Sequence, residues 1–588
     1  MASKETVNGT ASTDAPKSEW DRFWDIVTKN PDDFTSWEFL IRLAETSGGG
    51  LTADSPESDI VNLRHCYDTF LAKFPLCFGY WKKYVDWENL LKGKDKAVET
   101  FERGVLAIHN SVELWTQYCQ FRVENFPADE DSCRMLFERA VASVGYDFYS
   151  HSLWDKYIEW EESKGQVTNV VRILDKLIAI PLHQYARFFE KYLQFMGARP
   201  PAELVPADQL AELEEQVRHP PAGSEQAVPK NDDEMQLELR KAIYNLKSAV
   251  YMKTQEEVLK RWTFEGEIKR PYFHVKPLDE SQLANWRKYL DFEEAEGNDA
   301  RVIILYERCL VACALYDEFW LRYAHYMLSK NNTDGAQNVF YRACFTFIPA
   351  SRPQARFAYA KFLESQGRAK EARDTYELIL QATPGHVECT LRSSQFEMRQ
   401  GSLETAVQIL KKACEGATVD DRGKAYLSAQ LAKLLFGSGD IEGCRTTLKE
   451  AVAKYSEARF LWMSYVVFEV NQPGAEALKY VREAYDLVKS SNLATPDKRD
   501  LSLRCLDVFL ERCTDISIIN TMESDFQKYS LPTAGGVSGA KKRALEDAAS
   551  HPAKFVAGAA PVGAGPPVAP AGGYAQGYAY GAPTTAAY

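Results

Sequence analysis

Residues 81–103 read WKKYVDWENLLKGKDKAVETFER, and residues 286–308 repeat the same spacing as WRKYLDFEEAEGNDARVIILYER. In both stretches a tryptophan is followed at three-residue steps by a tyrosine and a second aromatic residue, and then directly by a glutamate. An aromatic–Glu–Arg cluster begins 20 residues after each tryptophan. Steps of three and six residues keep the aromatic side chains on one side of an α-helix. The fixed distance to the second cluster predicts two paired helices that meet in the same register each time.

The pattern recurs along most of the chain. Further copies begin at Trp115, Trp154 and Trp320, and a weaker one begins at Trp462. Self-similarity at a period of roughly 35–45 residues is typical of helical-repeat proteins, which stack hairpins into a solenoid. The sequence therefore predicts an all-α solenoid, with a buried repeat core that comprises Trp81, Tyr84, Trp87, Trp115, Tyr118, Trp154, Tyr157, Trp286, Tyr289, Trp320, Tyr323, Trp462 and Tyr465.

Breaks in the pattern divide the chain into five regions. A Pro-rich and acidic stretch interrupts the repeats near residue 200, and a long charged helix is expected after it. The Ala-, Gly- and Pro-rich end has too little apolar surface to fold. The predicted regions are a disordered leader (1–19), an N-terminal array (20–198), a linker with a long helix (199–276), a C-terminal array (277–530) and a disordered Ala/Gly/Pro/Tyr tail (531–588).

The overall charge favours protein partners over nucleic acid. The 588 residues carry a formal net charge of −13, whereas a protein that binds RNA phosphates is usually basic or has a basic face. RNA contact is therefore expected to be indirect or local. The best local candidate is the predicted long helix, whose basic residues are Arg240, Lys241, Lys247, Lys253, Lys260, Arg261, Lys269, Arg270 and Lys276. We expect no membrane contact, since the polar start resembles no secretory signal and no apolar run is long enough to span a bilayer.

The sequence contains no motif for catalysis or cofactor binding. It has neither a G-x-x-x-x-G-K-[ST] phosphate loop nor an H-E-x-x-H zinc motif, and its twelve cysteines include no C-x-x-C pair. We therefore expect a protein that is not an enzyme, with no catalytic, cofactor-binding or metal-binding residues.

The charged positions of the repeat suggest contacts between the helices of one hairpin. We predict that Glu88 pairs with Arg103 and that Glu293 pairs with Arg308, which would fix the helix register. The last helices are apolar although no further repeat follows to cover them. An uncovered apolar end suggests a partner, so we expect a dimer contact among the C-terminal repeats. The candidate interface residues are Trp462, Tyr465, Phe468 and Phe509.

The motif W-x-x-Y-x-x-[FW]-E followed by [FY]-E-R-[AC] resembles the half-a-tetratricopeptide (HAT) repeat of RNA-processing scaffolds. Longer strings, such as residues 74–84 (FPLCFGYWKKY) and 270–278 (RPYFHVKPL), resemble the pre-mRNA-processing factor 39 family over roughly residues 20–530. This resemblance implies a nuclear splicing factor that associates with proteins of the U1 small nuclear ribonucleoprotein (U1 snRNP). It also implies support of 5′ splice-site recognition and alternative splicing, and a dimer formed with itself or with a related HAT protein.

Two alternatives remain open from the sequence. A HAT scaffold of pre-mRNA 3′-end formation, such as the 77-kilodalton cleavage-stimulation subunit, shares the repeats and a Pro-rich tail. A direct RNA-binding protein is the other alternative, although the acidic balance argues against it. In the tail, Lys541-Lys542-Arg543 is a short candidate for a nuclear import signal.

Overall fold

The computed structural model describes residues 18–218, 232–474 and 476–530, and within these ranges all regular secondary structure is helical. This confirms the predicted all-α helical-repeat fold. The tail, its basic cluster and nearly all of the leader lie outside the described residues, as does part of the Pro-rich linker. Within the described ranges, no helix combines the length and apolar character needed to cross a lipid bilayer.

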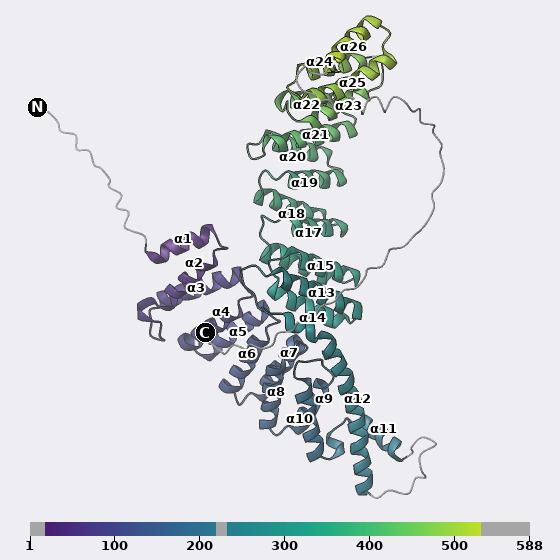
Figure 1. The fold of residues 1–588 in the computed structure, drawn as a ribbon. Helices are drawn as coiled ribbons and strands as arrows, with labels where there is room; N and C mark the ends of the chain where they lie inside the picture. The colour runs from purple at the N-terminus through teal and green to yellow at the C-terminus, as the bar shows by residue number, and fades with distance from the viewer. Residues whose placement is uncertain (1–17, 219–231, 475, 531–588) are drawn as a thin grey trace, which may run out of the picture. The chain divides into compact units, whose positions relative to one another are not determined.

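Antiparallel helices follow one another along the chain, and each packs mainly on its sequence neighbours (Figure 1). The first ten are α1 (Glu19–Lys29), α2 (Phe34–Glu45), α3 (Glu57–Lys73), α4 (Phe78–Lys92), α5 (Lys94–Ala107), α6 (Val112–Asn125), α7 (Glu130–Val144), α8 (His151–Ser163), α9 (Val167–Leu177) and α10 (Tyr185–Ala198). The short α11 (Ala207–Arg218) and the 36-residue α12 (Asp232–Glu267) come next.

The second series of hairpins begins after α12. Its helices are α13 (Glu280–Glu296), α14 (Asp299–Ala312), α15 (Asp317–Ser329), α16 (Thr333–Arg342), α17 (Gln354–Ser365), α18 (Ala369–Ala382), α19 (Val387–Arg399), α20 (Leu403–Glu415), α21 (Asp421–Gly437), α22 (Ile441–Lys454), α23 (Arg459–Val470), α24 (Ala477–Ser490), α25 (Thr495–Arg512) and α26 (Ile516–Ser530). Short 3₁₀ or π turns, η1 (Ser47–Gly49), η2 (Pro201–Glu203) and η3 (Ala343–Phe347), lie between them.

A short turn joins the two helices of a hairpin, as α13 and α14 illustrate. Gly297 ends α13 in the left-handed conformation (φ 76°), which a glycine adopts without a Cβ clash. The next residue, Asn298, caps α14 by accepting a hydrogen bond from the backbone N–H of Arg301 (3.3 Å). Two adjacent residues thus stop one helix and start the next, so the second helix folds back against the first.

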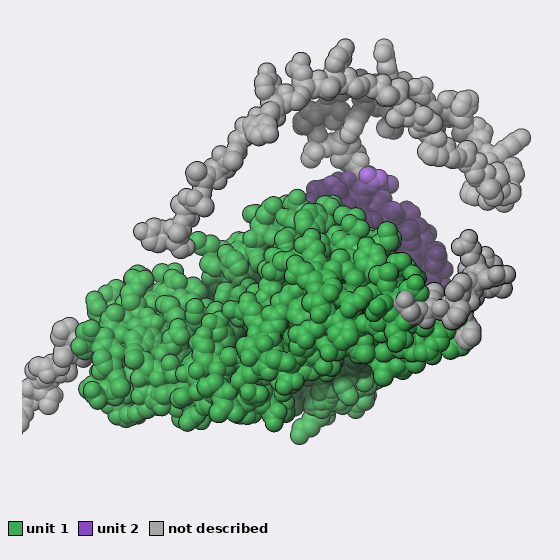
Figure 2. Space-filling view, turned by 90° about the horizontal axis from the view of Figure 1, so that it is seen from below, with its two compact units in different colours: residues 1–461 green, residues 462–588 purple. Residues whose placement is uncertain are grey.

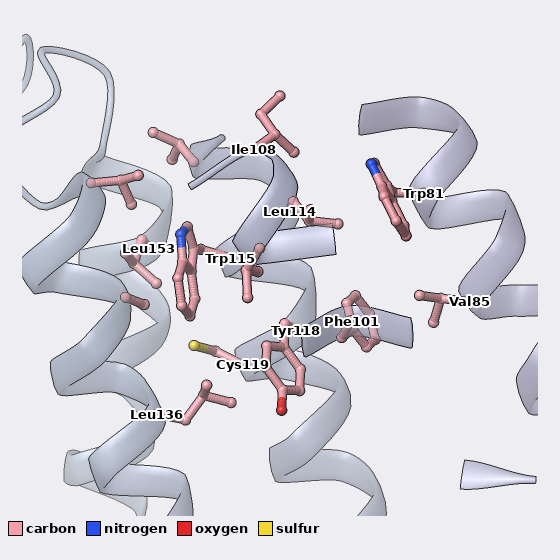
Figure 3. Close-up of a cluster of buried hydrophobic side chains, with 14 of the residues drawn as sticks. Trp81, Val85, Phe101, Ile108, Leu114, Trp115, Tyr118, Cys119, Leu136 and Leu153 are labelled. Carbon is pink, nitrogen blue, oxygen red and sulfur yellow. The ribbon is translucent and has the colours of Figure 1, made fainter. Parts of the chain in front are cut away.

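Aromatic side chains from neighbouring hairpins form the continuous core. Figure 3 shows Trp81 of α4, Phe101 of α5 and Trp115 and Tyr118 of α6 in one buried layer. The indole of Trp81 lies against Gly104, where an added Cβ would stand 3.3 Å from the ring. A small residue is thus needed three positions after the aromatic residue of the second helix, which explains the end of the [FY]-E-R-[AC] motif.

The described chain forms two compact units, residues 1–461 and 462–588, coloured separately in Figure 2. Unit 1 contains the helices of the N-terminal array and the helices α13 to α22, and the boundary between the units falls within α23. Unit 2 contains α24, α25 and α26, where the hydroxyl of Tyr485 donates to the Met522 carbonyl (3.1 Å) and Lys489 pairs with Asp525. The five-region division made from the sequence stays a prediction. Within it, α12 lies in the region 199–276, where the sequence predicts a long helix.

Candidate functional site

A triad of polar side chains recurs between successive hairpins of unit 1. An acidic residue on the second helix of one hairpin accepts a hydrogen bond from a tyrosine on the first helix of the next hairpin. The same acid pairs with an arginine on the second helix of that next hairpin. The described residues include five inter-repeat triads: Asp68–Tyr84–Arg103, Glu102–Tyr118–Arg139, Glu138–Tyr157–Arg172, Glu265–Tyr289–Arg308 and Glu307–Tyr323–Arg342.

The triads explain why glutamate and arginine are adjacent in the motif. Glu102 receives the Tyr118 hydroxyl at 2.6 Å and Arg139 at 2.9 Å, both from the following hairpin. Its neighbour Arg103 reaches back to Asp68 of the preceding hairpin at 2.7 Å. Consecutive residues of an α-helix point about 100° apart. The Glu–Arg dipeptide therefore contacts one neighbouring hairpin on each side.

A second charged contact joins each of four buried glutamates to an arginine of the preceding helix. Arg64 of α3 donates from Nε and Nη2 to the two carboxylate oxygens of Glu88, both at 2.7 Å. The glutamate side chains are between 0% and 4% exposed. The bidentate pairs are Arg64–Glu88, Arg134–Glu161, Arg261–Glu293 and Arg373–Glu397.

These contacts correct the predicted charge pairs. Glu88 contacts Arg64 and not Arg103, and Glu293 contacts Arg261 and not Arg308. The predicted residues are thus in salt bridges, but with partners in other helices. The sequence shows the period of the charged positions but not the neighbour that each one faces.

Stacked rings accompany the triads. Each triad tyrosine lies nearly parallel to an aromatic residue of the preceding helix, as in Phe101–Tyr118 (4.8 Å between centroids, 13°) and Phe264–Tyr289 (5.0 Å, 5°). Offset stacking at this separation is favourable beyond the burial of area. Three of the triad arginines also lie over the tryptophan of their own hairpin: Arg103 is 5.7 Å from the Trp81 ring, Arg139 is 5.5 Å from the Trp115 ring and Arg342 is 5.2 Å from the Trp320 ring.

The residues predicted for the repeat core are nearly all buried. Trp87 is the exception: it is half-buried, and its Nε1–H donates to Glu45 at 3.3 Å. The buried members are Trp81, Tyr84, Trp115, Tyr118, Trp154, Tyr157, Trp286, Tyr289, Trp320, Tyr323, Trp462 and Tyr465.

The end of α12 is the second helix of a further repeat, which the tryptophan spacing alone does not reveal. Arg261 pairs with Glu293, Phe264 stacks on Tyr289, and Glu265 belongs to an inter-repeat triad. The spacing R-x-x-[FY]-[DE] of these residues also occurs at Arg64-Tyr67-Asp68, and it would have revealed the repeat. The C-terminal array thus begins inside α12 and not at residue 277.

The other half of α12 contacts the N-terminal array. Lys247 pairs with Asp175, the hydroxyl of Thr254 donates to the Ile178 carbonyl (2.7 Å), and Tyr251 stacks on Phe189. One helix therefore belongs to both arrays, and its polar side chains serve internal contacts. Of its basic residues, Lys247 and Arg261 are buried in ion pairs, so these two are not accessible to a phosphate.

The two arrays also meet through a buried charge cluster, here called the junction cluster, which comprises Asp147, Glu265 and Arg308. Arg308 of α14 donates to Glu265 (2.6 Å) and forms a 2.6 Å salt bridge from Nε to Asp147, which precedes α8 in the N-terminal array. Burial raises the pKa of Asp147. Burial alone would lower the pKa of Arg308, but Asp147 and Glu265 together hold it well above its usual value.

The residues predicted for a dimer interface do not form an exposed surface. Trp462, Tyr465, Phe468 and Phe509 are each no more than 9% exposed in the single chain. Trp462, Tyr465 and Phe468 follow the core spacing of the repeat, so the chain buries them itself. The exposed apolar side chains of α25 and α26 in unit 2 include Leu503, Leu510 and Ile516, at 41%, 52% and 65%.

The described residues contain no group of three or more His, Cys, Asp or Glu side chains placed to hold a metal ion. Ten of the twelve cysteines are buried, and burial raises the pKa of thiols such as Cys66 and Cys505 to about 12. Thiols with such a raised pKa carry little thiolate at neutral pH and are poor nucleophiles.

Stacked hairpins with recurring triads define a HAT-type helical-repeat protein. Two family models match this chain, the PRP39 N-terminal HAT repeat over residues 21–194 and the PRP39 C-terminal HAT repeat over residues 259–399. The second match begins inside α12, in agreement with the contacts of Arg261 and Glu265. The chain belongs to the pre-mRNA-processing factor 39 family.

Curated relatives agree with this assignment. The chain is 43% identical to Pre-mRNA-processing factor 39 of Schizosaccharomyces pombe over 470 residues, which covers 78% of this chain and 77% of the relative. It is 30% identical to the Homo sapiens protein of the same name, covering 92% and 83%. The U1 small nuclear ribonucleoprotein component PRP42 of Saccharomyces cerevisiae is 26% identical over 53% of this chain and 58% of the relative.

The crystal structure of CSTF-77 aligns with a TM-score of 0.45 at 11% identity, covering 80% of this chain and 95% of that one.

Proposed function

We propose that this chain is a non-enzymatic scaffold of pre-mRNA splicing that acts in the nucleus in association with U1 snRNP proteins. In this role it supports recognition of the 5′ splice site and thereby alternative splicing. The observation that carries the proposal is family membership across both arrays, together with the similarity to a U1 snRNP component. The architecture suits the role, because repeats locked by inter-repeat triads hold binding surfaces at fixed distances.

The test is a pull-down of the tagged full chain from nuclear extract, followed by sequencing of the RNAs that accompany it. We expect enrichment of U1 RNA that is lost when the particle proteins are removed. Recovery of cleavage and polyadenylation factors without U1 RNA would instead support the 3′-end scaffold. Direct binding of purified chain to U1 RNA, weakening steeply between two salt concentrations, would support the RNA-binding alternative.

Dimerisation is part of the proposal, but through residues other than those first predicted. Leu503 and Leu510 lie seven residues apart on α25 and so share one face, and Ile516 begins α26 close by in sequence. Phe509 and Ile518 line a neighbouring groove. We assign this surface to a second copy of the chain or to a related HAT protein, because exposed apolar side chains grouped on one face favour a protein contact.

Sedimentation of the 66.6 kDa chain tests the dimer. The double variant Leu510→Glu and Ile516→Glu should shift the mass from dimer to monomer at low micromolar concentration. Leu106→Glu is the matched control, because Leu106 is 77% exposed on α5 of the other unit. A wild-type chain that sediments as a monomer, or a double variant that remains dimeric, would contradict this assignment.

A further inference from the structure

A cavity of about 250 Å³ lies beside the junction cluster, where segments of both arrays come together in unit 1. Phe78 and Glu113 line it from the N-terminal array, while Tyr272, Trp286 and Arg308 line it from the other side. Small-molecule sites usually measure roughly 300–1,000 Å³. This cavity is smaller and suits a single long side chain with a short piece of backbone.

Trp286 contributes a buried hydrogen-bond donor that has no acceptor. Its side chain is 1% exposed and its indole Nε1–H has no partner. In four other hairpins the equivalent indole donates to the carbonyl six residues earlier, as Trp81 does to Pro75 (2.8 Å) and Trp320 does to Ala314 (2.8 Å). Those helices start three residues before the tryptophan, whereas α13 starts six residues before Trp286. The carbonyl of Glu280 is therefore at the start of the helix and does not accept the indole.

The charge around the cavity is negative. Among the described residues that line it, Arg308 carries the positive charge, and it is already bound by Asp147 and Glu265. Glu113 at the rim adds a further carboxylate that is exposed to solvent. The lining thus carries two carboxylates, Asp147 and Glu113, and one guanidinium that is already paired, so an anionic ligand would be repelled and a cationic one attracted.

Aromatic rings line the same cavity. Tyr149 and Tyr272 are 42% and 47% exposed at its mouth, and Phe78 and Trp286 lie among the other lining residues. Exposed tyrosines beside carboxylates are suited to a guanidinium, which can stack flat on a ring while it donates hydrogen bonds to an acid.

We propose that this junction cavity binds an arginine side chain of an extended, basic peptide segment of a partner protein. The guanidinium stacks on Tyr272 and pairs with Glu113, and a carbonyl of the peptide accepts the free indole N–H of Trp286. The inference deepens the proposed scaffold function by giving the chemistry of one partner. Its test uses purified components, so its failure would leave the association with splicing proteins intact.

The experiment measures fluorescence anisotropy of a labelled glycine–serine peptide with two arginines, titrated with the full chain. The same peptide with citrulline in place of arginine keeps the shape and removes the charge. We expect the citrulline peptide to bind at least about tenfold more weakly, because both the ring stacking and the acid pairing need the cation. No binding of the arginine peptide at millimolar protein, or equal binding of the two peptides, would overturn the proposal.

Variants then locate the site. Glu113→Gln with Tyr272→Ala should weaken binding by about tenfold. The matched control, Glu99→Gln with Tyr244→Ala, changes an exposed glutamate and a 43% exposed tyrosine that do not line the cavity, and it should leave binding unchanged. If both double variants bind like wild type, the peptide binds elsewhere and the assignment is wrong.

Replacement of Trp286 by phenylalanine separates binding from folding. The indole N–H has no acceptor among the residues that the structure describes, so Trp286→Phe should cost less stability than Trp320→Phe, which removes a satisfied hydrogen bond. Despite this small cost in stability, Trp286→Phe should bind the arginine peptide more weakly than wild type, because the donor to the peptide carbonyl is lost. A folded Trp286→Phe chain with unchanged affinity would contradict the role of this donor.

Discussion

The same triad is exposed in the N-terminal array and buried where the C-terminal array begins. The side chains of Arg139 and Glu102 are 50% and 36% exposed, whereas those of Arg308 and Glu265 are 12% and 1% exposed. Residues of the N-terminal array make the difference, because Asp147 contacts Arg308 and His109 lies 3.5 Å from Glu307. Identical chemistry should therefore stabilise the two regions by different amounts. Exposed ion pairs contribute about 0–1 kcal/mol, while breaking a buried pair costs about 3–5 kcal/mol.

The largest expected effect is that of Arg308→Ala. The change leaves Asp147 and Glu265 buried without their counter-charge, so we expect the free energy of unfolding to fall by about 3–5 kcal/mol. Urea unfolding followed by circular dichroism measures this, and the melting temperature should fall in parallel. An unchanged melting temperature would mean that the junction cluster does not stabilise the fold.

A smaller, pH-dependent effect is expected at Glu257 of α12. Burial alone would raise the pKa of this carboxyl, but hydrogen bonds from Lys260, Arg261 and Arg301 lower it to about 2. A lowered folded-state pKa stabilises the protein above the ordinary value of 4.5, and this contribution disappears as the pH falls toward 2. The Glu257 side chain is 25% exposed, so water screens part of its interaction with the three cations. We therefore expect Glu257→Gln to lower the free energy of unfolding by about 2 kcal/mol at pH 7.

The measurement is the difference in urea midpoint between wild type and Glu257→Gln at several pH values. This difference should be largest near neutral pH and should shrink below about pH 4.5. A constant difference from pH 7 to pH 3 would show that the ionised carboxylate is not the source of the effect.

The tyrosine hydroxyls offer a matched pair of smaller changes. Tyr289→Phe removes a donor to the buried Glu265, and Tyr118→Phe removes a donor to the half-exposed Glu102. Hydrogen bonds to buried charged groups contribute more, so we expect losses of about 2 kcal/mol and about 0.5 kcal/mol, respectively. Equal losses would show that burial of the acid does not determine the contribution of the triad.

The smallest effect is expected for Arg139→Ala in the N-terminal array. Arg139 is half-exposed and pairs with Glu102, which remains accessible to water. The loss should be at most about 1 kcal/mol and should diminish in high salt. A loss as large as that of Arg308→Ala would remove the contrast between the two regions.

The sequence predicted the fold class because the tryptophan and tyrosine spacing reports helical periodicity directly. It could not assign the charge pairs, because adjacent charged residues such as Glu102 and Arg103 face different neighbours. The repeat at the end of α12 has no tryptophan-containing helix before it, so the sequence predicts a long helix there but not a repeat. Trp462 and Tyr465 are predicted both for the core and for a dimer interface, and their burial agrees with the core spacing. The contact between Asp147 and Arg308 joins residues 161 positions apart, and no local pattern reports such a pair.

The most direct test of this account is a double-mutant cycle at Asp147 and Arg308, using Asp147→Asn and Arg308→Met and the free energy of urea unfolding. The reference cycle is Asp68→Asn with Arg103→Met, an exposed pair of the N-terminal array. We predict a coupling energy of about 1–3 kcal/mol at the junction and close to zero for the reference pair. A junction coupling no larger than that of the reference pair would contradict the claim that the buried junction cluster stabilises the contact between the two arrays more than an exposed pair does.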